Sequence, residues 1–209
     1  MTRRLSRLLF AAALATAASA KADENRAFGG IRVYAGYLMV ASPSGLGPDS
    51  ANNVDAAVNG PGFGAQFFVL NPIDPVMIGV DAGYCPAIWE YTHYKDATAN
   101  AYWRKEALSA VPVHAVMEID LAHFVVQAGL GAAFMRFTGY YSDGSVVDDT
   151  TAMFSLMSGI GLRVFLGDSS SLDLFARLYV VPGVDYGDFT AGSRKTMVCV
   201  MPGLSLTFK

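Results

Sequence analysis

The sequence predicts an all-β protein: an eight-stranded antiparallel up-and-down β-barrel that crosses a membrane. Eight segments alternate apolar residues with small or polar ones, which is the two-residue period of a β-strand. The connections between them alternate between short and long. The chain is 53% hydrophobic and 16% charged, with 21 glycines among 209 residues. This composition excludes a disordered chain, and a net charge of -3 argues against a nucleic-acid partner.

The first 20 residues predict a cleaved signal peptide, which leaves residues 21–209 as one barrel domain. A basic start, an apolar run over 8–18 and a small-residue cleavage site follow one another, with Arg3, Arg4 and Arg7 at the start and Ala18-Ser19-Ala20 at the end. The alternative is a membrane anchor, but the run is shorter than the ~20 apolar residues of a spanning helix. We therefore expect an exported protein whose cysteines meet an oxidising compartment.

The first half of the chain holds four of the alternating segments, at 31–39, 63–69, 78–84 and 111–119. In the third, for example, Ile78, Val80 and Ala82 alternate with Gly79 and Asp81. Apolar residues at every second position give each strand one apolar face. These four segments therefore predict the first four strands of the barrel.

The second half continues the pattern at 126–134, 154–164, 172–180 and 198–208, with Ser158 as a polar residue on the apolar face. These segments run to roughly ten residues, the length that a tilted strand needs to cross a bilayer. Soluble strands alternate over shorter stretches. The length of the alternation therefore favours transmembrane strands.

The connections support the same topology. Short gaps at 71–75, 120–123 and 167–170 have turn compositions, and longer gaps fall at 41–61, 88–102, 138–150 and 183–194. Short turns on one side and long loops on the other are typical of outer-membrane barrels. An even number of strands places both termini on the short-turn side.

The polar face decides between two classes of barrel. A soluble lipocalin-like barrel would carry an apolar ligand inside and needs a well-charged exterior. The polar face instead offers three cations, three anions, two amides and one imidazole: Arg32, Gln66, Asp81, His114, Glu118, Gln127, Arg163, Asp173 and Arg177. Balanced charges suit a filled barrel interior, because an unpaired buried charge is costly. We therefore expect these residues inside and the apolar face against lipid.

The last segment, 198–208, is an alternating apolar strand that ends on an aromatic residue. With the overall pattern, it resembles the eight-stranded outer-membrane β-barrels of Gram-negative bacteria, such as the OmpA membrane domain, OmpX and OmpW-like proteins. The resemblance implies a place in the cell outer membrane, contact with its lipid and lipopolysaccharide, and an assembly signal for the barrel-assembly machinery on Leu204, Leu206 and Phe208. Lys209 follows Phe208, whereas that family ends on the aromatic residue.

The predicted function is structural, or a surface interaction through the long loops, with a narrow channel as a variant. The alternatives are a soluble periplasmic barrel with an apolar ligand and a lipid-modifying outer-membrane enzyme. His114 and Glu118 share one face of a strand, but that face points inward, so we expect a structural polar core and no enzyme. We expect no cofactor, no metal site and a monomer.

Four smaller predictions concern single residues. Arg104 and Lys105 could contact lipid head groups. Asp143, Asp148 and Asp149 share one loop, where a solvated loop is the default over a divalent-cation site. Cys85 and Cys199 belong to strands that are not neighbours, so we expect two buried free thiols. Aromatic girdles are expected from nine residues near strand ends: Tyr37, Phe63, Tyr84, Trp89, Trp103, Phe124, Phe137, Tyr140 and Phe208.

Overall fold

The computed structural model describes residues 30–42, 54–73, 75–94, 102–121, 123–166, 170–184 and 195–208. The predicted signal peptide at 1–20 lies outside these ranges. The strands are β1 (Gly30–Ser42), β2 (Val54–Val58), β3 (Gly60–Ile73), β4 (Val76–Tyr94), β5 (Tyr102–Leu121), β6 (Phe124–Tyr141), β7 (Val146–Leu166), β8 (Ser170–Val184) and β9 (Lys195–Phe208). Within the described ranges, the chain has no helix long and apolar enough to span a bilayer.

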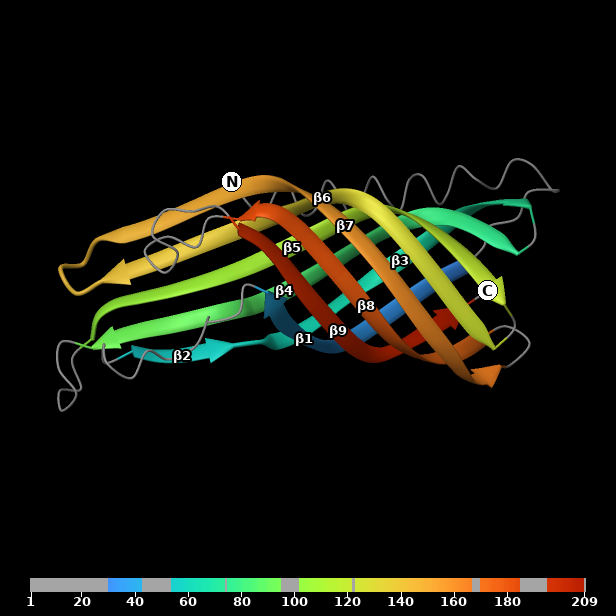
Figure 1. Cartoon of the computed structure of the whole chain (residues 1–209), viewed down its shortest axis with the longest axis horizontal. Coiled ribbons are helices and arrows are strands. Elements are labelled where there is room, and N and C mark those ends of the chain that lie inside the picture. Colours follow the sequence, from blue (N-terminus) through green and yellow to red (C-terminus); the bar gives the residue numbers. More distant parts are fainter. Residues whose placement is uncertain are drawn as a thin grey trace.

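The strands close into one antiparallel barrel (Figure 1). Neighbours follow the order β4-β3-β1-β9-β8-β7-β6-β5, and pairing of β4 with β5 joins the two ends. Each neighbour in this ring is antiparallel to the next. The predicted fold, a closed eight-stranded antiparallel barrel, is confirmed.

β2 and β3 together occupy one strand position of the barrel, and the chain bends at Asn59 between them. Asn59 has a φ of 96°, a conformation that asparagine tolerates better than most residues. Its backbone N–H donates to the carbonyl of Ile88 at 3.0 Å, and its Oδ1 accepts from the N–H of Val40 at 2.8 Å. Above this kink β2 pairs with β4, while β3 pairs with both β1 and β4.

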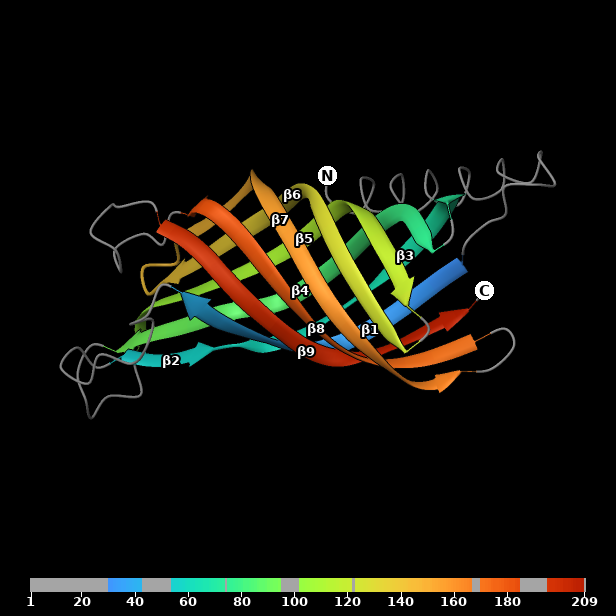
Figure 2. The same ribbon diagram turned by 45° about the vertical axis from the view of Figure 1, so that its right-hand side comes forward.

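The two ends of the barrel differ. Ile31 pairs with Phe208, so β1 begins and β9 finishes at one end, which we call the terminal end. At the opposite end, the projecting end, β2, β4, β5, β6 and β7 continue well beyond β1, β8 and β9 (Figure 1), and Figure 2 shows β2 and β4 reaching past β1 and β9. Both described termini lie together on the side of the short turns, as expected.

The projecting end corrects the loop predictions at 41–61, 88–102 and 138–150. β4 runs to Tyr94, β5 starts at Tyr102, and the β6–β7 hairpin leaves only 142–145 between its strands. β2 also falls inside the first predicted loop. Bilayer thickness sets a minimum strand length but no maximum, and neighbouring strands continue to satisfy each other's backbone groups beyond it.

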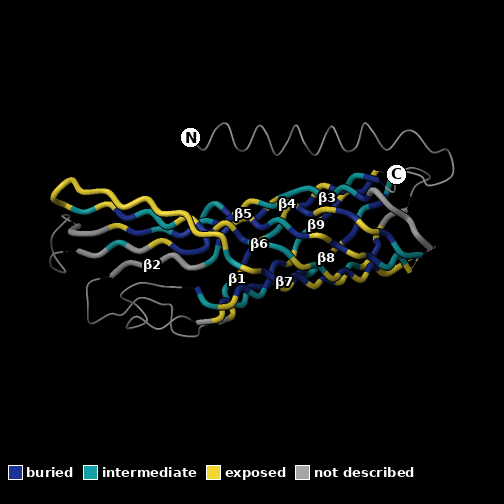
Figure 3. Tube along the Cα trace, turned by 90° about the horizontal axis from the view of Figure 1, so that it is seen from above, coloured by how far each residue is buried: buried dark blue, intermediate teal, exposed yellow. Residues whose placement is uncertain are grey.

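The alternation of exposure along the strands confirms the predicted registers wherever the side chains are described (Figure 3). Large apolar side chains line the outer wall, with Val33 44%, Leu130 61% and Ile160 66% exposed. The charged side chains of the other face lie inside, where Arg32 is 2% and Glu118 0% exposed. This arrangement rules out the lipocalin-like alternative, which requires the opposite orientation.

The interior has two layers. A polar layer containing Arg32 and Glu118 lies toward the terminal end, and an apolar layer lies toward the projecting end, with Leu38, Leu108, Val181 and Met197 among its residues. The sequence analysis expected a polar interior and did not foresee the second layer. It arises because inward positions beyond the charged residues are occupied by apolar and sulfur-containing side chains.

The girdle prediction is partly correct. Six of its residues lie on the outer wall, 42–58% exposed: Tyr37, Phe63, Tyr84, Phe124, Tyr140 and Phe208. Trp89 and Phe137 instead belong to the interior, where their rings pack at 5.9 Å. Both occupy inward positions of their strands, so proximity to a strand end did not decide their orientation. The side chain of Trp103 lies outside the described residues.

Candidate functional site

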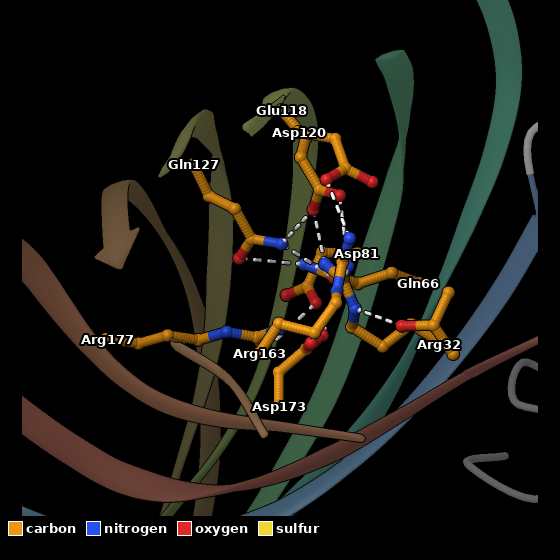
Figure 4. Close-up of polar contacts among 10 residues, drawn as sticks. Arg32, Gln66, Asp81, Glu118, Asp120, Gln127, Arg163, Asp173 and Arg177 are labelled. Atoms are coloured by element: carbon orange, nitrogen blue, oxygen red, sulfur yellow. Dashed lines mark hydrogen bonds and ion pairs between the residues drawn. The ribbon is translucent and has the colours of Figure 1, made fainter. Parts of the chain in front are cut away.

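The polar layer is centred on Arg32 and Glu118. Both side chains point inward from strands on different sides of the barrel (Figure 4). Nη2 of Arg32 donates to Oε1 of Glu118 at 2.9 Å, and Nη1 donates to Oε2, which makes the pair bidentate. Nε of Arg32 also donates to Oγ1 of Thr207 at 2.8 Å. A bidentate pair with its remaining donors bonded is the form in which a buried charge pair is tolerated.

Two amides extend this centre. Nη1 of Arg32 donates to Oε1 of Gln66 at 3.2 Å, and the same oxygen accepts from Nε2 of Gln127 at 3.0 Å. Nε2 of Gln127 also donates to Oε2 of Glu118 at 2.5 Å. These hydrogen bonds join four strands of the barrel. Arg32 lies on β1, Gln66 on β3, Glu118 on β5 and Gln127 on β6.

A second ion-pair cluster lies toward the terminal end. Nε of Arg163 donates to Oδ1 of Asp173 at 3.0 Å, and Nη1 donates to Oδ1 of Asp120 at 2.8 Å. Asp173 also lies 3.7 Å from Nη2 of Arg32, which links this cluster to the centre. The Asp120 side chain is 15% exposed, whereas that of Asp173 is 2% exposed.

A third cluster joins the polar layer to aromatic rings. Oδ1 of Asp81 accepts from Nη1 of Arg177 at 3.4 Å, and Oδ2 accepts from the hydroxyl of Tyr34 at 3.3 Å. The Arg177 guanidinium lies over the ring of Tyr34 at 3.6 Å and over Phe175 at 4.8 Å. Stacking of this kind stabilises a guanidinium away from water.

Asp81, His114 and Ser155 form a chain of acid, imidazole and hydroxyl. Nε2 of His114 lies 3.0 Å from Oγ of Ser155, and Nδ1 lies 3.6 Å from Oδ2 of Asp81. A serine nucleophile needs such an order of groups and also access to substrate. Ser155 is 0% and His114 1% exposed, so neither side chain is presented at the protein surface, where a substrate would bind. Ser155 and Nε2 of His114 thus satisfy each other, while Nδ1 of His114 faces Asp81 without a hydrogen bond.

All nine residues of the predicted interior network lie inside, in three clusters, and the contact between Asp173 and Arg32 links the first two. The sequence analysis placed four further polar residues on the inward face without naming them in the network, and it missed Asp120: the four are Tyr34, Ser155, Ser205 and Thr207. Each occupies an inward position of its strand. Continuing the alternation past Glu118 would have found Asp120, which had been assigned to a turn.

The outer wall carries a cation that the sequence analysis did not select. Arg136 lies on the outer face of β6, opposite Ser109 and directly beyond the lipid-facing Phe134. Lys105, one of the two predicted head-group residues, is exposed and lies four residues further out than Ser109. The side chain of Arg104 lies outside the described residues. Extending the outward alternation of β6 by one step beyond Phe134 would have identified Arg136.

The β6–β7 hairpin organises two of the three loop aspartates. Arg136 pairs with Asp148 through two hydrogen bonds, at 2.8 and 2.7 Å, and this contact lowers the pKa of Asp148. Asp143 accepts from Oγ of Ser145 at 2.6 Å and from its N–H at 2.8 Å, which lowers the pKa of Asp143. The three acids therefore serve different roles, and Asp149 stands exposed on β7.

Cys85 and Cys199 are buried free thiols, as predicted. They line one small apolar cavity on the projecting side of the polar layer, although β4 and β9 are separated by β3 and β1 in the barrel. Among the described residues, no group of three or more His, Cys, Asp or Glu side chains is placed to hold a metal ion.

The predicted assembly residues Leu204, Leu206 and Phe208 lie on the outer face of β9, at 51%, 37% and 48% exposure. β9 pairs with β1 on one side and with β8 on the other, so this strand completes the barrel. Lys209 lies outside the described residues.

Comparison with protein families finds no matching family. Comparison with curated proteins also finds no match. Several solved structures are similar to this chain, including the following three. Neisserial surface protein A has 15% identity, coverage of 86% of this chain and 96% of that one, and a TM-score of 0.45. OprG from Pseudomonas aeruginosa has 12% identity, coverage of 88% and 97%, and a TM-score of 0.46. Ail of Yersinia pestis has 12% identity, coverage of 86% and 97%, and a TM-score of 0.43. The chain thus has the architecture of a small outer-membrane β-barrel, a conclusion carried by its own closed ring of strands and apolar outer wall.

Proposed function

We propose that this protein is an outer-membrane barrel with a closed interior that binds another polypeptide at its projecting end. The apolar outer wall supports residence in a bilayer, because such a surface is unstable in water. The predicted signal peptide and the position of both termini at the short-turn end support export, with the projecting end outside the cell. The projecting sheet is then the part that meets external partners.

The observation that carries this proposal is the free edge of β7. β7 pairs with β6 from Val146 to Leu162, but its pairing with β8 begins only at Leu156. Within the described residues, 146–155 therefore have a backbone edge without a ladder partner. Residues 146–152 are all exposed. An exposed edge of this kind accepts an added strand through main-chain hydrogen bonds.

The side chains along this edge indicate the type of partner. Val146, Val147, Thr150 and Thr151 favour an extended backbone and are all exposed. Asp149 adds a negative charge at the edge, beside Asp148. The proposed partner is therefore an extended segment with basic side chains, placed antiparallel or parallel to β7.

The interior supports a closed barrel over the channel variant. Arg32, Gln66, Asp81 and Glu118 have exposures of 2% or less and meet in the barrel interior. An eight-stranded barrel has an interior just wide enough for side chains to fill. We therefore assign the function to the outer surface and treat the polar layer as a structural plug.

The test uses the mature chain in lipid nanodiscs and a fluorescent extended peptide of alternating Val and Thr with flanking lysines. We expect binding that slows amide hydrogen exchange at 146–155. A variant in which 137–149 are replaced by an Asn-Gly turn should lose binding and keep the barrel. Asp143→Ala, at the hairpin tip, is the matched control and should bind as wild type. Equal binding by the shortened variant would assign the interaction to another surface.

A further inference from the structure

The barrel interior contains a small, partly open cavity between the polar layer and the projecting end. Twelve residues line it, and four of them carry sulfur: Cys85, Met135, Met197 and Cys199. These side chains come from β4, β6 and β9, and each of the four is 6% exposed or less. The cavity has a volume of about 20 Å³, which is enough for a water molecule or a single ion.

The two cysteines meet here although their strands are not neighbours. They are the only two cysteines in the sequence, and both line the same cavity. Met201 lies close by: a Cβ placed on Gly62 would be 2.7 Å from its Sδ and 3.4 Å from Sγ of Cys85. The Sδ atom of Met201 and the Sγ atom of Cys85 therefore both lie beside the space that Gly62 leaves open.

We propose that this cavity is a binding site for one soft monovalent metal ion of the Cu(I) or Ag(I) type. Thiolate and thioether ligands select such ions, whereas Ca²⁺ and Mg²⁺ require oxygen ligands. Zn²⁺ is held by thiolate, imidazole and carboxylate groups, and the thioethers of Met135 and Met197 supply none of these. A lining that includes two thiols and two thioethers thus favours this class of metal.

Charge favours a monovalent ion over a divalent one. The space is lined by apolar surface, where an unbalanced charge is costly. A monovalent cation bound to one thiolate and to neutral sulfur atoms forms a neutral unit. In the binding step a sulfur–metal bond forms, the S–H bond of that thiol breaks, and its proton passes to solvent. No oxidation or reduction takes place.

This inference is independent of the proposed surface binding, because it concerns the interior and not the β7 edge. The probe is silver nitrate, titrated into the folded full chain in micelles in chloride-free buffer. We expect about one silver ion per chain after gel filtration, with proton release during binding. X-ray absorption at the silver edge should show sulfur neighbours only.

Variants separate the site from general thiol chemistry. Cys85→Ala combined with Cys199→Ala should abolish binding, and Met197→Leu should weaken it while both thiols remain. Met39→Leu and Met117→Leu, which are on the outer wall at 40% and 48% exposure, are the matched controls and should bind as wild type. Heat-modifiable gel migration verifies that each variant is folded.

Three outcomes would overturn the site. The first is full silver binding by the double cysteine variant. The second is coordination of the silver ion by oxygen or nitrogen atoms. The third is binding of silver by Met197→Leu with the affinity of the wild-type chain. Failure of wild-type chain with intact thiols to retain silver would also overturn it. Isolation of the native chain two mass units light would show that a disulfide occupies the sulfur atoms and would contradict the proposal as well.

Discussion

Arg32 on β1 and Glu118 on β5 form a bidentate ion pair across the barrel, although their strands are not hydrogen-bonded neighbours. The backbone ladders hold each strand to its two neighbours only. The Arg32–Glu118 pair and the hydrogen bond between Gln66 and Gln127 instead connect strands that no ladder joins. The interior network thus connects opposite sides of the barrel, and the backbone ladders close its circumference.

Glu118→Ala should destabilise the barrel by about 3–5 kcal/mol, because it leaves the buried Arg32 guanidinium without its main partner. Urea unfolding in micelles, followed by gel migration, measures the change. Asp149→Ala, at an exposed position of β7, should stay within about 0.5 kcal/mol of wild type. Equal losses in the two variants would show that the pair contributes little.

Leu130→Arg should cost about 2–4 kcal/mol, because Leu130 lies on the outer wall at 61% exposure, where lipid is expected. The yield of folded protein in outer membranes and its unfolding in micelles both report this cost. Val147→Arg places the same charge on the projecting end, at a site 41% exposed, and should be mild. An equally mild effect at Leu130 would mean that water bathes the outer wall.

Arg136→Gln should raise the pKa of Asp148 toward its ordinary value of 3.8, since the hydrogen bonds from Arg136 hold it lower. Because the folded-state pKa is depressed, the contact stabilises the hairpin above the unfolded pKa and this contribution is lost as pH falls through the folded pKa. Carboxyl carbon shifts measured by NMR during acid titration give both values. Asp143, which is held by Ser145, should not shift in the same variant.

Cys85 and Cys199 should resist maleimide in the folded barrel and react fully after unfolding, because they are 6% and 1% exposed. Mass spectrometry counts the added groups. Thr150→Cys supplies an exposed thiol on the projecting end as a reactive control. Labelling of the native cysteines at the rate of this control would indicate that the interior opens readily.

The wild-type barrel should show no steady ionic current in planar bilayers, because the three ion-pair clusters fill the terminal half of the interior. Replacement of Arg163 and Asp173 by alanine removes the cluster nearest the terminal end and provides a comparison of the same fold. A stable conductance in the wild-type chain would favour the narrow-channel variant, with selectivity set by the interior charges.

The inward and outward positions of all eight barrel strands were predictable from alternation alone. A strand has only two faces, so once Asp81 and Ile78 are assigned, every second residue follows. The same alternation of inward and outward residues explains the errors in placing single side chains. Trp89 and Phe137 were placed by their distance from a strand end, and Asp120 was placed in a turn, although each occupies an inward position.

The extent of the strands beyond the membrane was less predictable. Residues 88–94, 102–109 and 138–150 alternate less clearly than the membrane segments, since no lipid requires their outer face to be apolar. Only pairing with neighbours shows that they are β-structure. The kink at Asn59 likewise depends on its contacts with Val40 and Ile88, which lie far from it in sequence.

The sequence by itself determined the barrel class, its strand order and which side chains lie inside, because these properties follow from a two-residue period and from the lengths of the gaps. Tertiary structure alone decided which of those inward groups meet. It joined Arg32 to Glu118, brought Cys85 and Cys199 to one cavity, and left the β7 edge open. The reason is geometric: alternation gives the direction of a side chain but not its height in the barrel, and height is set by the stagger of strands that pair only after folding.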